Sequence, residues 1–287
     1  MMLPANRWVA PLSLSVALVL PKAWAVDSEL PDSPIPATAI NEAADTQDRS
    51  VTFSKSSVHA TTREITWRAL PGDFAHDQKD IWLTFPRQLA TGHLWLPVLG
   101  IAGGTAALIY ADPHVARYFR NHQTNLDKMN DVFDPLITTG EVIAVPASLI
   151  FAGYVRHDPY QVDTALSSAL AYGDSAVVDL AVKAITRRQR PSDVAAIGTF
   201  TGTFFNGSKS PFKGSAFPSG HAAGAFSVAT VVATRYENHK WVPWLVYGMA
   251  TAISISRITT NAHFSSDVFL GAAIGYTTAK YQVLRPK

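Results

Sequence analysis

The sequence KAITRRQRP at residues 183–191 is followed by PSGH at 218–221 and by SRITTNAHFSSD at 256–267. Apolar runs separate these three clusters. Together they hold cations, two histidines, a carboxylate and a Ser-Gly turn. Side chains of these kinds are suited to holding a phosphate and attacking it.

The first cluster pairs two cations. Lys183 and Arg190 are seven residues apart, about two turns, so a helix through both would project them from nearly the same face. Pro191 would end that helix and leave Arg190 at its end. Arg can grip two phosphate oxygens, whereas Lys acts as a point charge. The structural alternative is a solvated basic helix end, which Arg187 and Arg188 favour.

The second cluster precedes an apolar helix that is predicted to start near Ala222. A turn formed by Ser219 and Gly220 presents a hydroxyl and free backbone N–H groups, which suit an anion. Glycine lets a ligand approach the backbone closely. His221 can donate a proton to a leaving group. The alternative is an ordinary serine N-cap beside an incidental histidine.

The third cluster places His263 four residues before Asp267. On one helical turn the carboxylate would hold the Nδ1 proton and leave Nε2 free as a nucleophile, with Asn261 capping the helix. Arg257 would point about 120° away from His263 on a continuous helix. The chain must therefore break between them, and residues 259–261 have poor helix propensity. A purely structural His–Asp pair is the alternative.

The order and spacing of these motifs, Lys-x6-Arg-Pro, Pro-Ser-Gly-His and Ser-Arg-x5-His-x3-Asp, resemble the type 2 phosphatidic acid phosphatase (PAP2) superfamily. That superfamily includes bacterial class A acid phosphatases and vanadium haloperoxidases. Every motif position is matched, and the resemblance covers about residue 94 to the C-terminus. It implies an all-α fold, a helical bundle of the PAP2/haloperoxidase type with the site between helices.

The resemblance also implies roles. His263 would be the nucleophile, Asp267 would orient it, and His221 would be the general acid and base. The phosphate-binding residues would be Lys183, Arg190, Ser219, Gly220 and Arg257. The function implied is a metal-independent phosphatase that hydrolyses phosphate monoesters or lipid phosphates and diphosphates through a phosphohistidine, with no metal and no cofactor. One alternative is a vanadium-dependent haloperoxidase, with vanadate as cofactor; another is a non-catalytic helical membrane protein.

The composition of the chain restricts the classes of protein to which it can belong. The chain has no cysteine, which excludes disulfides and thiolate chemistry. Its net charge of +2 and lack of a basic block argue against nucleic acid as a partner. Residues 1–25 read as a signal peptide, with an uncleaved anchor as the alternative. Residues 26–66 are expected to be a poorly ordered linker, and residues 67–287 the PAP2-like domain.

Six apolar segments are predicted to be helices, at 94–111, 142–154, 165–185, 222–234, 241–256 and 268–279. The first has no charge and is the best candidate for a membrane span. Residues 67–89 predict an amphipathic helix, packed on the core rather than at a membrane surface. A soluble bundle and a compact membrane bundle both remain open. The expected enzyme is exported and periplasmic, or associated with the inner membrane and facing the periplasm, with a phosphorylated lipid or a small phosphomonoester as substrate.

Overall fold

The structure is a computed structural model of the chain, and it describes residues 63–92, 94–122, 135–207 and 215–285. The segment predicted as a signal peptide and almost all of the predicted linker lie outside these residues. The described residues contain helices and no strand, which confirms the predicted all-α fold class.

The elements follow one another as α1 (Leu70–Lys79), η1 (Asp80–Thr84), α2 (Phe85–Ala90), α3 (Trp95–Asn121), α5 (Pro135–Arg156), α6 (Pro159–Thr186), η3 (Pro191–Asp193), α7 (Gly220–Arg235), α8 (Trp241–Thr259), α9 (Ser265–Thr278) and η4 (Ala279–Val283). All six predicted apolar helices are present. α3 and α6 extend beyond their apolar runs; at α6 this follows from Asp158, whose side chain accepts hydrogen bonds from two backbone N–H groups of the first turn.

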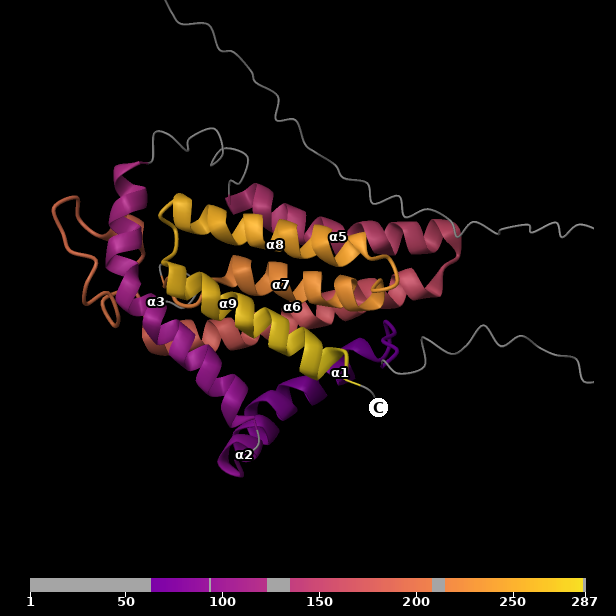
Figure 1. Cartoon of the computed structure of the whole chain (residues 1–287). Helices are drawn as coiled ribbons and strands as arrows, with labels where there is room; N and C mark the ends of the chain where they lie inside the picture. The colour runs from indigo at the N-terminus through magenta and orange to yellow at the C-terminus, as the bar shows by residue number, and fades with distance from the viewer. Residues whose placement is uncertain (1–62, 93, 123–134, 208–214, 286–287) are drawn as a thin grey trace, which may run out of the picture. The chain divides into compact units, whose positions relative to one another are not determined.

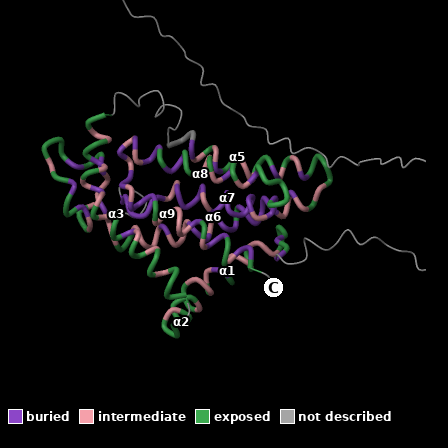
Figure 2. Tube along the Cα trace, viewed as in Figure 1, coloured by how far each residue is buried: buried purple, intermediate pink, exposed green. Residues whose placement is uncertain are grey.

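Helix α7 lies at the centre of the bundle and packs against α6, α8 and α9. Most of its residues are buried, including Ala222, Ala223 and Val231, and the burial view shows this concentration (Figure 2). A helix that is apolar on nearly all sides is stable only when other helices surround it. The N-terminus of α7, which carries the second motif, is thereby held inside the bundle.

Two glycines let α9 contact the backbone of α7. A Cβ atom at Gly271 would lie 2.3 Å from the Ser219 carbonyl oxygen, and one at Gly275 would lie 2.1 Å from that of Ala223. Only residues without a side chain permit such an approach. As a result, the Ser219 N–H donates to the carbonyl of Asp267 at 2.9 Å, which joins the second motif to the third.

Helix α6 ends at Thr186, and Arg187 has a left-handed backbone with φ 40°. The predicted helix through to Pro191 is therefore wrong. The chain turns after Lys183, and Arg190 lies in extended backbone before η3. The two cations meet through this turn rather than through helical spacing.

The predicted amphipathic helix at 67–89 is divided into α1, η1 and α2. Leu70 and Phe74 on α1 pack against the core, as predicted. Trp82, Leu83 and Phe85 are instead about half exposed, and α2 projects away from the bundle (Figure 1). Packing on the core is thus confirmed for α1 and wrong for η1 and α2.

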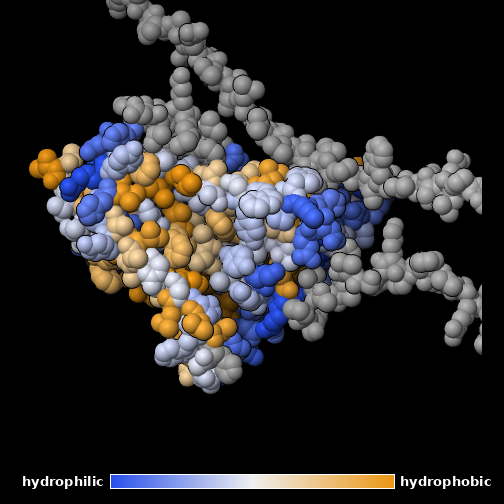
Figure 3. Space-filling model, in the orientation of Figure 1, coloured by the Kyte–Doolittle hydropathy of each residue, from blue (hydrophilic) through white to orange (hydrophobic). Residues whose placement is uncertain are grey.

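Three helices among the described residues, α3, α5 and α6, are long and apolar enough to cross a membrane. The first coincides with the predicted best candidate, and only 11% of its most apolar window is buried. Leu96 and Tyr110 on this helix are each more than 80% exposed. Hydrophobic surface covers much of α3 and the neighbouring parts of α8 and α9 (Figure 3). These apolar helices support association with a membrane.

Candidate functional site

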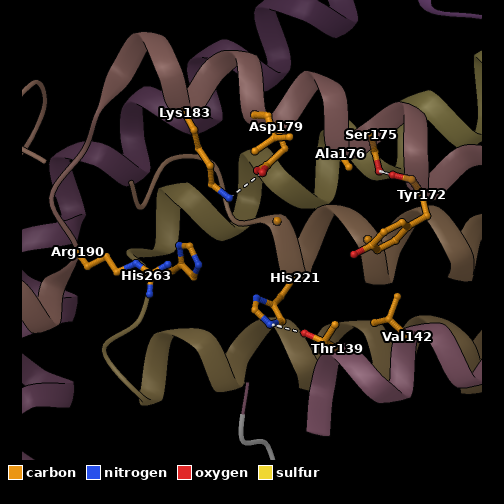
Figure 4. Close-up of a pocket in the computed structure, with 13 residues that line it drawn as sticks. Thr139, Val142, Tyr172, Ser175, Ala176, Asp179, Lys183, Arg190, His221 and His263 are labelled. Carbon is orange, nitrogen blue, oxygen red and sulfur yellow. Dashed lines mark hydrogen bonds and ion pairs between the residues drawn. The ribbon is translucent and has the colours of Figure 1, made fainter. Parts of the chain in front are cut away.

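A cavity of about 280 Å³ opens between α5, α6, α7 and the connector before α9. Its lining includes five of the eight predicted site residues, namely Lys183, Arg190, Gly220, His221 and His263 (Figure 4). The other three, Ser219, Arg257 and Asp267, are completely buried and do not line the cavity. Residues from all three motifs thus meet at one cavity.

The two cations in the cavity differ in their partners. Lys183 Nζ donates to Asp179 Oδ2 at 2.7 Å, one turn earlier on α6. Arg190 Nε is buried and has no hydrogen-bond partner among the described residues. A buried guanidinium nitrogen without an acceptor is costly, so an anion in the cavity would stabilise it.

The loop that carries Arg190 is fixed from two sides. Arg120 at the end of α3 donates to the carbonyl oxygens of Pro191 and Val194. The Ser192 N–H donates to the carbonyl of Asn261 at 3.0 Å, which links the first motif to the third. Arg190 is therefore held in place although it lies outside a long helix.

The N-terminus of α7 faces the cavity. Ser219 is fully buried in extended backbone, and its hydroxyl neither caps the helix nor meets any partner among the described residues. The alternative of an ordinary serine N-cap is therefore wrong. The first-turn N–H groups of a helix have no intrahelical acceptor, and they suit an anion. His221 Nε2 lies 3.1 Å from the Thr139 hydroxyl of α5.

The chain breaks between Arg257 and His263, as predicted. Helix α8 ends at Thr259, α9 begins at Ser265, and Asn261 has φ 55°. Asn261 does not cap α9, because Phe264 occupies that position; it makes the left-handed turn after α8 instead. The N–H groups of Ala262 and His263 both donate to the Arg257 carbonyl, at 3.1 and 3.0 Å. The break thus fixes His263 beside the last turn of α8.

The imidazole of His263 has a different nearest partner from the one predicted. Its Nδ1 lies 2.7 Å from the carbonyl oxygen of Ala216 and 3.6 Å from Asp267 Oδ2. Because His263 precedes α9, the helical four-residue spacing does not apply to it. A carbonyl only accepts, so Nδ1 carries the proton and Nε2 is the basic nitrogen. Asp267 Oδ2 instead accepts from the Phe264 N–H at 2.7 Å.

Burial lowers the pKa of His263 below its ordinary value of 6.5. Asp267 acts in the opposite direction, whereas Lys183 and Arg190 lower the pKa further by repelling a second positive charge. The imidazole is therefore neutral at pH 7, which is the form that can act as a nucleophile.

Arg188 is buried beside the site. It is 1% exposed, whereas the structural alternative for the first cluster placed it with Arg187 on a solvated helix end. Its guanidinium donates to Asp267 Oδ1 at 2.6 Å, to Asp112 Oδ2 at 2.8 Å and to Ser266 Oγ at 2.7 Å. That alternative is wrong for Arg188, because α6 ends early and the chain then turns inward. Asp112, an acidic residue just beyond the apolar run at 94–111, was the available signal for a buried partner.

The cavity therefore combines two cations, the N-terminus of a buried helix, a neutral imidazole and a second histidine. Such an arrangement can bind an anion and supply both a nucleophile and a proton donor. Among the described residues, no group of three His, Asp or Glu side chains could hold a metal ion.

Part of this chain is similar to known proteins. Residues 164–285 match the model of the PAP2 superfamily. A lipid A 1-phosphatase of Porphyromonas gingivalis is 43% identical over 60 residues, which are 21% of this chain and 14% of that protein. A solved structure of a transmembrane PAP2 type phosphatidylglycerolphosphate phosphatase from Bacillus subtilis is 18% identical, with a TM-score of 0.43, over 65% of this chain and 90% of that one.

The matched region contains every residue of the three motifs, together with α7 and most of α6, two of the three helices that line the cavity. The resemblance that the motifs indicate is confirmed. Over residues 164–285 this chain is similar to the PAP2 superfamily.

Proposed function

We propose that this protein is a membrane-associated, metal-independent phosphatase that acts on lipid phosphates or diphosphates through a phosphohistidine. The observation that carries the proposal is the convergence of Lys183, Arg190, His221 and His263 on one cavity. Transfer of a phosphoryl group depends mainly on positioning and on neutralising charge. The cavity residues can both position a phosphoryl group and neutralise its charge.

In the first step, His263 Nε2 attacks phosphorus while the bond from phosphorus to the leaving oxygen breaks. Lys183, Arg190 and the first turn of α7 stabilise the charge on the phosphoryl oxygens. His221 gives its proton to the leaving oxygen, which departs as an alcohol or a phosphate. The hydrogen bond from Nδ1 to the Ala216 carbonyl stabilises the positive charge that develops on the imidazole.

In the second step, His221 accepts a proton from water, and the water oxygen attacks phosphorus. The bond between phosphorus and His263 then breaks, and inorganic phosphate leaves. Arg257 and Asp267 act from behind the cavity. Arg257 holds the backbone of His263, and Asp267 supports its imidazole at 3.6 Å.

A lipid substrate fits both the cavity and the surface. About 280 Å³ accommodates a phosphate group and the adjoining part of an alcohol, whereas acyl chains would extend outside it. The apolar, exposed surface of α3 matches the environment of such chains. We propose that the protein is exported and that its site faces the periplasm.

The test is release of inorganic phosphate by the full chain, purified in detergent and treated with EDTA. Phosphatidic acid, a prenyl diphosphate and a soluble phosphomonoester are compared. We expect the wild type to hydrolyse the lipid substrates. The rate should fall by a factor of about 10⁴ or more in His263→Ala. His239→Ala removes an exposed histidine and serves as the matched control. Equal turnover in the two variants would exclude His263 as the nucleophile.

A parallel assay with vanadate, peroxide and bromide tests for a haloperoxidase. Vanadate should only inhibit the phosphatase, because it resembles the transition state of phosphoryl transfer. Bromination without phosphate release from any ester would replace the proposal with the haloperoxidase function.

A further inference from the structure

Asp179 is an acidic residue within a cavity that otherwise suits anions. It lies on α6, lines the cavity beside Lys183 and Gly220, and its side chain is 6% exposed. One carboxylate oxygen, Oδ2, accepts from Lys183 at 2.7 Å. The other, Oδ1, is buried and has no hydrogen-bond partner among the described residues. Figure 4 shows Asp179 between Lys183 and the cavity residues of α6.

The Asp179–Lys183 pair is in direct contact with the N-terminus of α7. A Cβ atom at Gly220 would lie 3.2 Å from both Asp179 Oδ2 and Lys183 Nζ. A phosphate bound at the first turn of α7 would therefore meet the carboxylate as well as the ammonium group. Two like charges this close in a buried site repel strongly unless a proton lies between them.

We infer that Asp179 is a specificity-determining residue that accepts a hydrogen bond from a hydroxyl of the phosphate group. The inference rests on the proposed phosphate site. Lys183 turns toward the phosphoryl oxygens when substrate binds. The carboxylate, whose Oδ1 already lacks a donor, then accepts a hydrogen bond from the P–OH group in place of the one from Lys183. The cavity consequently selects phosphate that retains a proton, and it disfavours fully ionised anions of the same shape.

Sulfate provides the discriminating probe, because it has the size and shape of phosphate but carries no proton near neutral pH. Binding of inorganic phosphate and of sulfate to the full chain in detergent is measured by titration calorimetry, without any turnover. We expect the wild type to bind phosphate about tenfold or more tightly than sulfate. Equal affinity of the wild type for both anions would overturn the inference, and this measurement needs no variant.

The variant that tests the residue is Asp179→Asn, whose amide can donate to sulfate. It is expected to bring the phosphate-to-sulfate affinity ratio close to one, mainly by strengthening sulfate binding. Asp174→Asn is the matched control, since Asp174 is a fully buried aspartate on the same helix that bonds Gln78 and does not line the cavity. If Asp179→Asn does not fold, Asp179→Ser is used, and the same loss of preference is expected.

The outcomes separate the two proposals. A wild type that binds no phosphate contradicts the phosphate site and this inference together. A wild type that binds phosphate with no preference over sulfate, or an Asp179→Asn protein that keeps the wild-type ratio, overturns only the role of Asp179. If Asp179 only held Lys183 in place, Asp179→Asn would weaken the binding of both anions equally and leave the phosphate-to-sulfate affinity ratio unchanged.

Discussion

The imidazole of His263 is buried, and only one of its two nitrogens, Nδ1, is hydrogen-bonded to the Ala216 carbonyl. Burial disfavours the cation, and the Ala216 carbonyl fixes the proton on Nδ1. These two effects act together, because a neutral ring with a fixed tautomer presents one defined lone pair. The sequence predicts the histidine and its role, whereas a backbone carbonyl 47 residues away leaves no pattern near it in the sequence.

The lowered pKa of His263 predicts how its charge depends on pH. Since the pKa lies below 6.5, the ring stays neutral as pH falls through the range in which exposed histidines become protonated. Protonation, and loss of the nucleophile, should occur only at lower pH. The measurement is a pH titration of the imidazole ¹⁵N signals, with the His263 signals assigned by their absence in His263→Ala. His239 is the exposed reference, and a midpoint for His263 at or above 6.5 would contradict the prediction.

Arg188 holds two buried carboxylates, so its removal should destabilise the fold. In Arg188→Ala, Asp112 and Asp267 would remain buried without their cation, at a cost of about 3–5 kcal/mol. The free energy of unfolding is measured by denaturant titration in detergent. Arg187→Asn removes a neighbouring charge and tolerates the left-handed backbone at that position, so it should cost less than about 1 kcal/mol. Similar stability of the two variants would show that the buried network contributes little.

At the scale of helices, periodicity and composition predicted where the apolar elements lie but not where they end. The end of α6 at Thr186 depends on the left-handed Arg187 and on the contacts of the following loop with α3, which are not local in sequence. The break before His263 could be predicted from helix geometry and from the poor helix propensity of residues 259–261. Arg257, however, does not line the cavity. The start of α6 follows instead from the local cap by Asp158.

The close contact of α7 and α9 depends on the absence of side chains at two positions. Gly275→Ala would place a Cβ 2.1 Å from the Ala223 carbonyl oxygen, so the helices must separate, at a cost of about 1–3 kcal/mol. Gly248→Ala on α8 is the control, because nothing lies within 4 Å of its Cβ position. It should be neutral or stabilising by up to about 1 kcal/mol. Thermal unfolding of both variants tests this, and equal melting temperatures would contradict it.

At the scale of the whole molecule, the distribution of exposed apolar side chains predicts how the protein fractionates. Several large apolar side chains are more than 70% exposed, namely Leu96, Tyr110, Phe151 and Trp244. Exposure of many such side chains to water is unfavourable. We expect the protein to remain in the membrane pellet after a carbonate wash. Complete release into the supernatant would instead indicate a peripheral or soluble protein.

The sequence predicted the site residues better than it predicted their supports. Lys183, Arg190, His221 and His263 stand in motifs with informative spacing, and they meet at the cavity. Arg188 and Asp179 stand in no motif, because an isolated Arg or Asp has no informative spacing. The burial of Arg188 follows from partners on other helices, up to 79 residues away.

The bond from Arg188 to Asp112 crosses the boundary of the region that matches the family, since Asp112 lies on α3, outside residues 164–285. Thr139, the partner of His221, also lies outside it. A protein shortened to the matched region would keep every motif residue but would lose Asp112, one of the two carboxylates that pair with Arg188. Positions 112 and 188 should consequently change together in evolution, so that a natural variant lacking one of them lacks the other as well.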